Sequence, residues 1–122
     1  MPIYATIVAA LGLIVAIAHS VLGERVILGP LYREQTSGLL AARAMRDIIR
    51  AVFHIPSLAW AGLGIAVLLN RLQSGSDLLP ITAAIIFGLS GIGNLAALRR
   101  PHPGGLILLA MAVASVADIR FN

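Results

Sequence analysis

The chain of 122 residues has no cysteine and no lysine, and only 11% of its residues are charged. Without cysteine it can form no disulfide, no thiolate metal site and no cysteine-based active site. Soluble domains carry about 25% charged residues, whereas this chain combines its low charge with 59% hydrophobic residues. The composition therefore predicts an integral membrane protein instead of a water-soluble globule.

Patterns that carry catalysis are also missing. The five acidic residues offer no carboxylate pair, and the sequence shows no nucleophile with its base, no phosphate-binding loop and no nucleotide fingerprint. The nine cations are all arginine and flank apolar runs, so the net charge of +4 does not indicate a nucleic-acid partner. We expect neither an enzyme nor a nucleic-acid-binding protein.

Four apolar segments dominate the chain, at residues 3–22, 51–69, 78–98 and 104–121, and we expect the second to belong to a helix over 45–69. About 20 apolar residues in a helix cross a ~30 Å hydrocarbon core, and the segments lack the alternation of barrel strands. The fourth segment contains Asp118, which we expect to pair with Arg71 or Arg120. The predicted fold is all-α, with one domain (1–122) in which four transmembrane helices form an antiparallel bundle.

The arginines predict how this bundle is oriented. Seven of the nine lie between the first and second or between the third and fourth apolar runs, and only Arg71 and Arg120 lie on the opposite side. The positive-inside rule then places these two connections in the cytoplasm, and both termini and the 70–77 loop outside. Residues 1–6 carry no basic residue, so we expect the first segment to be retained as a helix and not cleaved as a secretory signal.

The connection at 23–50 is the longest. We expect Gly29 and Pro30 to break the first helix or its extension, and Ser37 to cap a helix that continues into the second span. The start of that helix has a charged face, which predicts an anchor on anionic lipid or the docking of a cytoplasmic partner. This face consists of Arg43, Arg46, Asp47 and Arg50.

Small residues recur at helical spacing on three segments and predict close helix packing. They are Ala5, Ala9, Gly12, Ala16 and Gly23, then Ser57, Ala61 and Gly64, and then Ala84, Gly88 and Gly91. A chain this short buries little core of its own, so we expect an accessory or self-associating subunit, in a homo-oligomer or a larger membrane complex. An oligomeric channel or a proton-coupled carrier is the alternative.

These stripes end in three polar residues at one depth near the cytoplasmic face: His19, His54 and Asn94. Polar groups inside a membrane are costly and are candidate functional sites. They can form a hydrogen-bonded plug or relay protons. Alternatively, His19 and His54 can be axial ligands of a haem or chlorin, or can join Glu24 around a divalent metal. Ser20, Ser57 and His102 lie on the same side.

The histidines belong to a longer pattern that covers about half of the chain. It consists of HSVLGER at 19–25 and, on the second helix, Arg50, Phe53, His54, Ser57 and Trp60. The pattern resembles that of small uncharacterised bacterial four-helix inner-membrane proteins. The resemblance implies a multi-pass protein of a bacterial inner membrane, whose termini the arginine distribution would then place in the periplasm. It singles out His19, Glu24 and His54, but it implies no activity.

Overall fold

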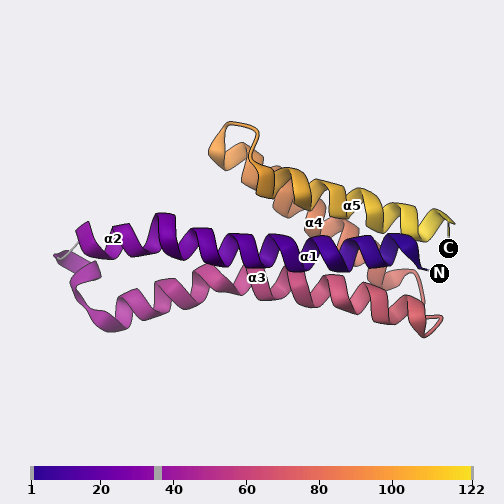
Figure 1. Ribbon diagram of the computed structural model, residues 1–122, viewed down its shortest axis with the longest axis horizontal. Coiled ribbons are helices and arrows are strands. Elements are labelled where there is room, and N and C mark those ends of the chain that lie inside the picture. Colours follow the sequence, from indigo (N-terminus) through magenta and orange to yellow (C-terminus); the bar gives the residue numbers. More distant parts are fainter. Residues whose placement is uncertain (1, 35–36, 122) are drawn as a thin grey trace.

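The computed structural model describes residues 2–34 and 37–121, and in them four long helices form an antiparallel bundle (Figure 1). α1 (Ile3–Leu22) continues through a π-helical turn, η1 (Gly23–Leu28), into α2 (Gly29–Glu34). A 3₁₀ turn, η2 (Gly38–Ala41), precedes α3 (Arg43–Leu72), and α4 (Leu78–Leu98) and α5 (Pro103–Phe121) complete the bundle. The all-α four-helix fold is confirmed, with no strand among the described residues.

The first helix is longer than predicted, because Gly29 and Pro30 do not break it. It runs without interruption from residue 3 to residue 34. Proline in a regular helix clashes with the carbonyl four residues back. In η1 the N–H of Gly29 instead reaches the carbonyl of Glu24, five residues back, and this wider turn accommodates the ring. A Cβ on Gly29 would lie only 2.9 Å from that carbonyl oxygen, so glycine suits the position.

The second long helix also differs from the prediction. α3 covers 43–72 instead of 45–69. Ser37 precedes η2 but makes no capping hydrogen bond, so its predicted role as a cap is wrong. The side chain of Arg46 donates to the carbonyls of Leu40 and Ala41 instead. An arginine from the first turn of α3 thus holds the preceding turn against the helix.

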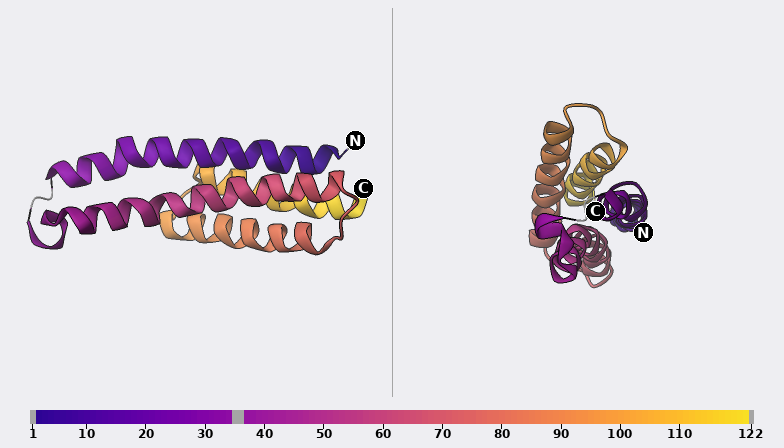
Figure 2. Two further views of the ribbon diagram at one scale, coloured as in Figure 1. Left: turned by 90° about the horizontal axis from the view of Figure 1, so that it is seen from below. Right: turned by 90° about the vertical axis from the view of Figure 1, so that its left-hand side faces the viewer.

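Glycines bring the helices into close contact, as the small-residue stripes predict. α1 packs against α3 and α5, while α4 packs against α5 and more lightly against α3, so the four helices form a ring when seen along the bundle (Figure 2). A Cβ on Gly12 would lie 2.9 Å from the carbonyl oxygen of Trp60. One on Gly64 would lie 3.0 Å from that of Val8. At both positions a side chain would press against the neighbouring backbone.

The two ends of the bundle differ. The start of α1, the end of α5 and the α3–α4 loop lie together at one end (Figure 1). At the other, which we call the histidine end, α2 and the start of α3 extend past the α4–α5 turn (Figure 2). All four helices are long and apolar enough to cross a membrane, and the 21 residues of α4 rise about 31 Å, close to the thickness of a hydrocarbon core. These are the dimensions of a small multi-pass membrane protein.

The pairing predicted between Asp118 and Arg71 is present at the end opposite the histidines. Asp118 on α5 is fully buried, and Arg71 Nε donates to its carboxylate at 2.5 Å. Another guanidinium nitrogen of Arg71 donates to Asp77 at 2.6 Å. Because Asp77 directly precedes α4, this arginine joins α3, α4 and α5.

Candidate functional site

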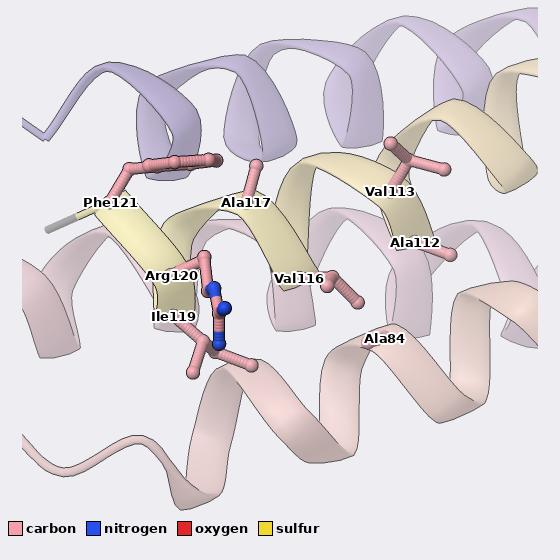
Figure 3. Close-up of a pocket in the computed structure, with 8 residues that line it drawn as sticks. All are labelled: Ala84, Ala112, Val113, Val116, Ala117, Ile119, Arg120 and Phe121. Atoms are coloured by element: carbon pink, nitrogen blue, oxygen red, sulfur yellow. The ribbon is translucent and has the colours of Figure 1, made fainter.

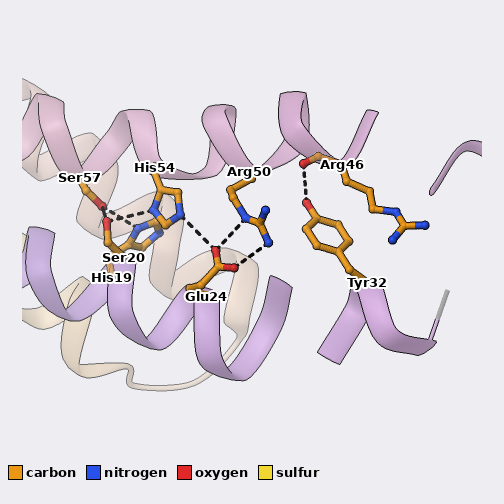
Figure 4. A network of polar contacts seen from close by, with 8 residues as sticks. All are labelled: His19, Ser20, Glu24, Tyr32, Arg46, Arg50, His54 and Ser57. Carbon is orange, nitrogen blue, oxygen red and sulfur yellow. Dashed lines mark hydrogen bonds and ion pairs between the residues drawn. The ribbon is translucent and has the colours of Figure 1, made fainter. Parts of the chain in front are cut away.

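A line of hydrogen bonds joins α1 to α3 at the histidine end (Figure 4). His19 Nδ1 lies 3.0 Å from Ser57 Oγ, and the hydroxyl of Ser20 donates to the same oxygen at 2.9 Å. His54 Nδ1 lies 3.1 Å from Ser20 Oγ. The two histidines, one from each helix, are therefore connected through two serine hydroxyls.

This line ends at an ion pair. His54 Nε2 lies 3.5 Å from Glu24 Oε2, and Arg50 donates to the two carboxylate oxygens at 3.1 and 2.8 Å. A two-point contact of this kind fixes the orientation of both groups. The side chains of Glu24 and Arg50 are 39% and 43% exposed, whereas Ser57 is buried. The polar network, as we call it, thus leads from an exposed charged end into the bundle; its members are His19, Ser20, Glu24, Arg50, His54 and Ser57.

Aromatic rings hold the inner end of the polar network. Phe53 stacks on the imidazole of His19 with ring centroids 4.5 Å apart, and Trp60 contacts the same imidazole edge-on at 5.2 Å. Gly23 makes room for Phe53, because a Cβ at this position would overlap the phenyl ring. Gly23 belongs to the π-helical turn, and such turns are frequent at functional sites.

A cavity of about 140 Å³ lies beside His19, where all four long helices and the α4–α5 turn meet. Asn94 contributes to its wall, and Asn94 Oδ1 is buried without a hydrogen-bond partner in the described part of the chain. His102 also lines it, and its Nδ1 accepts a hydrogen bond from the backbone N–H of Gly104 at 3.2 Å. Asn94 and His102 therefore meet His19 at the cavity and are not part of the polar network.

The sequence identified most of this site but missed one partner. The predicted residues His19, Glu24 and His54 all belong to the polar network, whereas Arg50 was assigned to a charged face for anionic lipid or a cytoplasmic partner. The helical register carries the missing signal. Starting from the contact between Ser20 and His54, four residues outward along each antiparallel helix lead to Glu24 and Arg50.

The charged face predicted at the start of α3 is partly turned toward α2. Tyr32 donates from its hydroxyl to the carbonyl of Arg46 at 2.9 Å, and the guanidinium of Arg50 lies 5.2 Å from the centre of the Tyr32 ring (Figure 4). Arg43 and Asp47 remain exposed, with 3.8 Å between their charged atoms. Anionic lipid at this face stays a prediction.

The cofactor predictions can be compared with this geometry. Both ring nitrogens of His54 face protein groups, and both oxygens of Glu24 accept from Arg50. No group of three or more His, Cys, Asp or Glu side chains is placed to hold a metal among the described residues. The cavity of about 140 Å³ is the size of one benzene ring, whereas haem and chlorin are macrocycles of four linked five-membered rings. The arrangement does not favour these cofactors, which stay predictions.

A larger hollow of about 790 Å³ lies at the end opposite the histidines, on the surface formed by α4 and α5 (Figure 3). Its wall is mostly alanine, valine and isoleucine, and Arg120 supplies its charged side chain. A membrane would fill such a surface with acyl chains. Apart from Arg120 this hollow is apolar, so it offers no counterpart to the polar network.

No family model, curated protein or solved structure matches this chain. The resemblance drawn from the pattern around His19 and His54 stays a prediction. Function has to be inferred from the geometry of the polar network and the cavity.

Proposed function

We propose that this protein is a small multi-pass membrane subunit whose polar network carries protons between the cytoplasmic surface and the cavity beside His19. The observation that carries the proposal is the unbroken line of hydrogen-bonding groups from the Glu24–Arg50 pair to His19. Between these ends lie only an imidazole and two hydroxyls, which both donate and accept hydrogen bonds. Imidazole also takes up and releases protons near neutral pH.

The hydrogens of the polar network can be arranged in two directions. In the first, His54 Nδ1–H donates to Ser20, Ser20 to Ser57, and Ser57 to His19 Nδ1. In the second, the same bonds run from His19 Nδ1–H back to His54 Nδ1. A proton taken up at His54 Nε2 and one released from His19 Nε2 convert the first arrangement into the second. Every step in between moves a hydrogen along a bond that already exists.

The polar network ends inside the bundle, which distinguishes this proposal from a channel. From His19 toward the opposite end, the buried residues of α1 are apolar. The buried Ser115 donates to the carbonyl of Met111 in its own helix, and Asp118 is held by Arg71. Among the described residues there is no continuous polar path across the bundle, so the geometry favours proton exchange with a group in the cavity.

Hydrogen exchange at His19 tests the proposal. Protein labelled with ¹⁵N-histidine and ¹⁵N-tryptophan is transferred in detergent micelles to D₂O, and NMR follows the loss of the His19 Nδ1–H signal, which the second arrangement carries. Ser57→Ala removes one link of the polar network. The exchange rate at His19 should fall at least about tenfold. Loss of one hydrogen bond worth about 1.4 kcal/mol raises the barrier to exchange by that amount, which corresponds to a factor of ten.

A static plug predicts the opposite result, because Ser57→Ala would only loosen the packing and His19 Nδ1–H would exchange at the same rate or faster. Ser115→Ala is the matched control, since it also removes a buried serine hydroxyl but lies outside the polar network. The indole N–H of Trp60, the only tryptophan, reports any general loosening in the same spectra.

Self-association is a second candidate role, favoured by the outer face of α4. The helices expose many large hydrophobic side chains, as contact with lipid requires, but α4 also turns Gly93 and Ala97 outward. A Cβ on Gly93 would meet nothing within 4 Å among the described residues. Small residues four positions apart allow a second helix to approach closely, so a second copy of α4 or a helix of a larger complex fits there.

A further inference from the structure

The cavity beside His19 has the size and lining of a small-ligand site. Its volume is about 140 Å³, and an apolar cavity of about 150 Å³ is large enough for benzene. Most of its lining is aliphatic, so a charged ligand would lose its hydration without compensation. Trp60, His19 and His102 place three aromatic rings in the wall, and rings pack favourably against an aromatic occupant.

Polar groups in the wall set a hydrogen-bonding preference. Asn94 Oδ1 is a buried acceptor that lacks a donor within the described residues. His102 accepts from Gly104 at Nδ1, so a neutral His102 carries its proton on Nε2 and is a donor there. A hydroxyl group satisfies both requirements, because it donates one hydrogen bond and accepts others.

We propose that this cavity binds one small uncharged aromatic alcohol of the size of phenol. Its hydroxyl forms hydrogen bonds with the carboxamide of Asn94 and with an imidazole N–H, while its ring packs against Trp60 and the aliphatic wall. Binding requires only the cavity. The further consequence, that the ligand hydroxyl lies at the inner end of the polar network and exchanges its hydrogen through His19, rests on the function proposed above.

The fluorescence of Trp60 reports occupancy directly, because Trp60 lines the cavity and is the only tryptophan. The full chain in detergent micelles is excited at the red edge of the tryptophan band, where phenol absorbs little, and is titrated with phenol and with benzene. Phenol should give a saturable change. Asn94→Leu should raise the Kd of phenol at least about tenfold, equivalent to ~1.4 kcal/mol, and should change the Kd of benzene less than about twofold.

Two phenylalanine variants separate binding in the cavity from partition into the micelle. Ala18 lines the cavity, so Ala18→Phe should abolish the saturable change. Ala10 is exposed on the same helix, so Ala10→Phe adds the same ring elsewhere and should keep it. A change that is not saturable, or that Ala18→Phe leaves intact, overturns the proposal.

Two other outcomes also overturn it. If phenol gives no response at any concentration, the cavity holds water or nothing, and if Asn94→Leu weakens phenol and benzene equally, the hydroxyl is not recognised. The failure of this inference is distinguishable from that of the proposed function. If exchange at His19 slows in Ser57→Ala but phenol does not bind, the proton path is supported and the ligand proposal is wrong. If phenol binds but exchange is unchanged, the ligand proposal is supported and the proton path is wrong.

Discussion

At the scale of single residues, the buried ion pair between Asp118 and Arg71 makes a direct stability prediction. Asp118 is fully buried and the side chain of Arg71 is 13% exposed. Removing one partner of a buried pair costs about 3 to 5 kcal/mol, because the other charge stays buried. Arg71 keeps Asp77 as a partner, so we expect Asp118→Asn to lower the free energy of unfolding by about 3 kcal/mol, measured by denaturant titration in detergent.

Arg120→Gln provides the control for that measurement. Arg120 lies two residues further along α5 and is exposed, and exposed substitutions stay within about 0.5 kcal/mol of the parent. If Asp118→Asn is as stable as Arg120→Gln, the buried pair does not hold α3 and α5 together. In that case glycine-mediated packing alone stabilises this end of the bundle.

Single residues also show how far the site could be read from sequence. His19 and His54 stand out because polar side chains are rare in apolar runs, and both were predicted correctly to lie at one depth. Their hydrogen-bond partners depend on how α1 is rotated against α3, which spacing along one helix does not determine. Asn94 was grouped with the histidines because it was expected at the same depth, but the rotation of α4 places it in the cavity wall.

At the scale of elements, the apolar runs predicted four helices and the bounds of α4 and α5, but not where the first two long helices end. Glu24 and the Gly29–Pro30 pair are typical of a connection in water, and a single sequence offers no sign that a π-helical turn will accommodate the proline. The extension is stabilised by tertiary contacts, since Leu28 and Tyr32 are buried. Tyr32 also donates to the backbone of α3 at Arg46. Contacts between distant segments thus decide the helix ends.

Substitutions at two glycines distinguish helix packing within the bundle from association between copies. Gly12→Leu places a side chain where a Cβ is already 2.9 Å from the backbone of α3, and overpacking of this kind costs about 1 to 3 kcal/mol. We expect a lower Tm in detergent. Gly93→Leu points outward, so it should keep the parent Tm while reducing the fraction of oligomer detected by chemical cross-linking in the membrane.

The reverse pattern would assign the two faces differently. A stable Gly12→Leu protein would mean that α1 and α3 do not approach as closely as this bundle requires. Cross-linking that is equally strong in Gly93→Leu and the parent would remove the outer face of α4 as an interface. This second result would leave the polar network and the cavity unaffected, because both lie between helices of one chain.

At the scale of the whole molecule, charge and shape single out the same end. The histidine end carries seven of the nine arginines, and there α2 and the start of α3 extend past the α4–α5 turn (Figure 1). α4 matches the thickness of a hydrocarbon core, so we expect the extension to reach the headgroups and the water beyond. Glu24 and Arg50 lie on this extension and His19 lies closer to the centre of the bundle, so the proposed proton path would have one end in water and one inside the bundle.

Single-cysteine variants test which side of the membrane this end faces. The chain has no cysteine, so Ser37→Cys at the histidine end and Ser74→Cys in the opposite loop each carry one thiol at an exposed position. The arginine distribution predicts that an impermeant maleimide labels Ser74→Cys in intact bacteria and labels Ser37→Cys only after the membrane is opened. The opposite labelling pattern would reverse the orientation of the bundle in the membrane. The Glu24–Arg50 pair would then meet the outside, so protons would reach the cavity beside His19 from the periplasm and not from the cytoplasm.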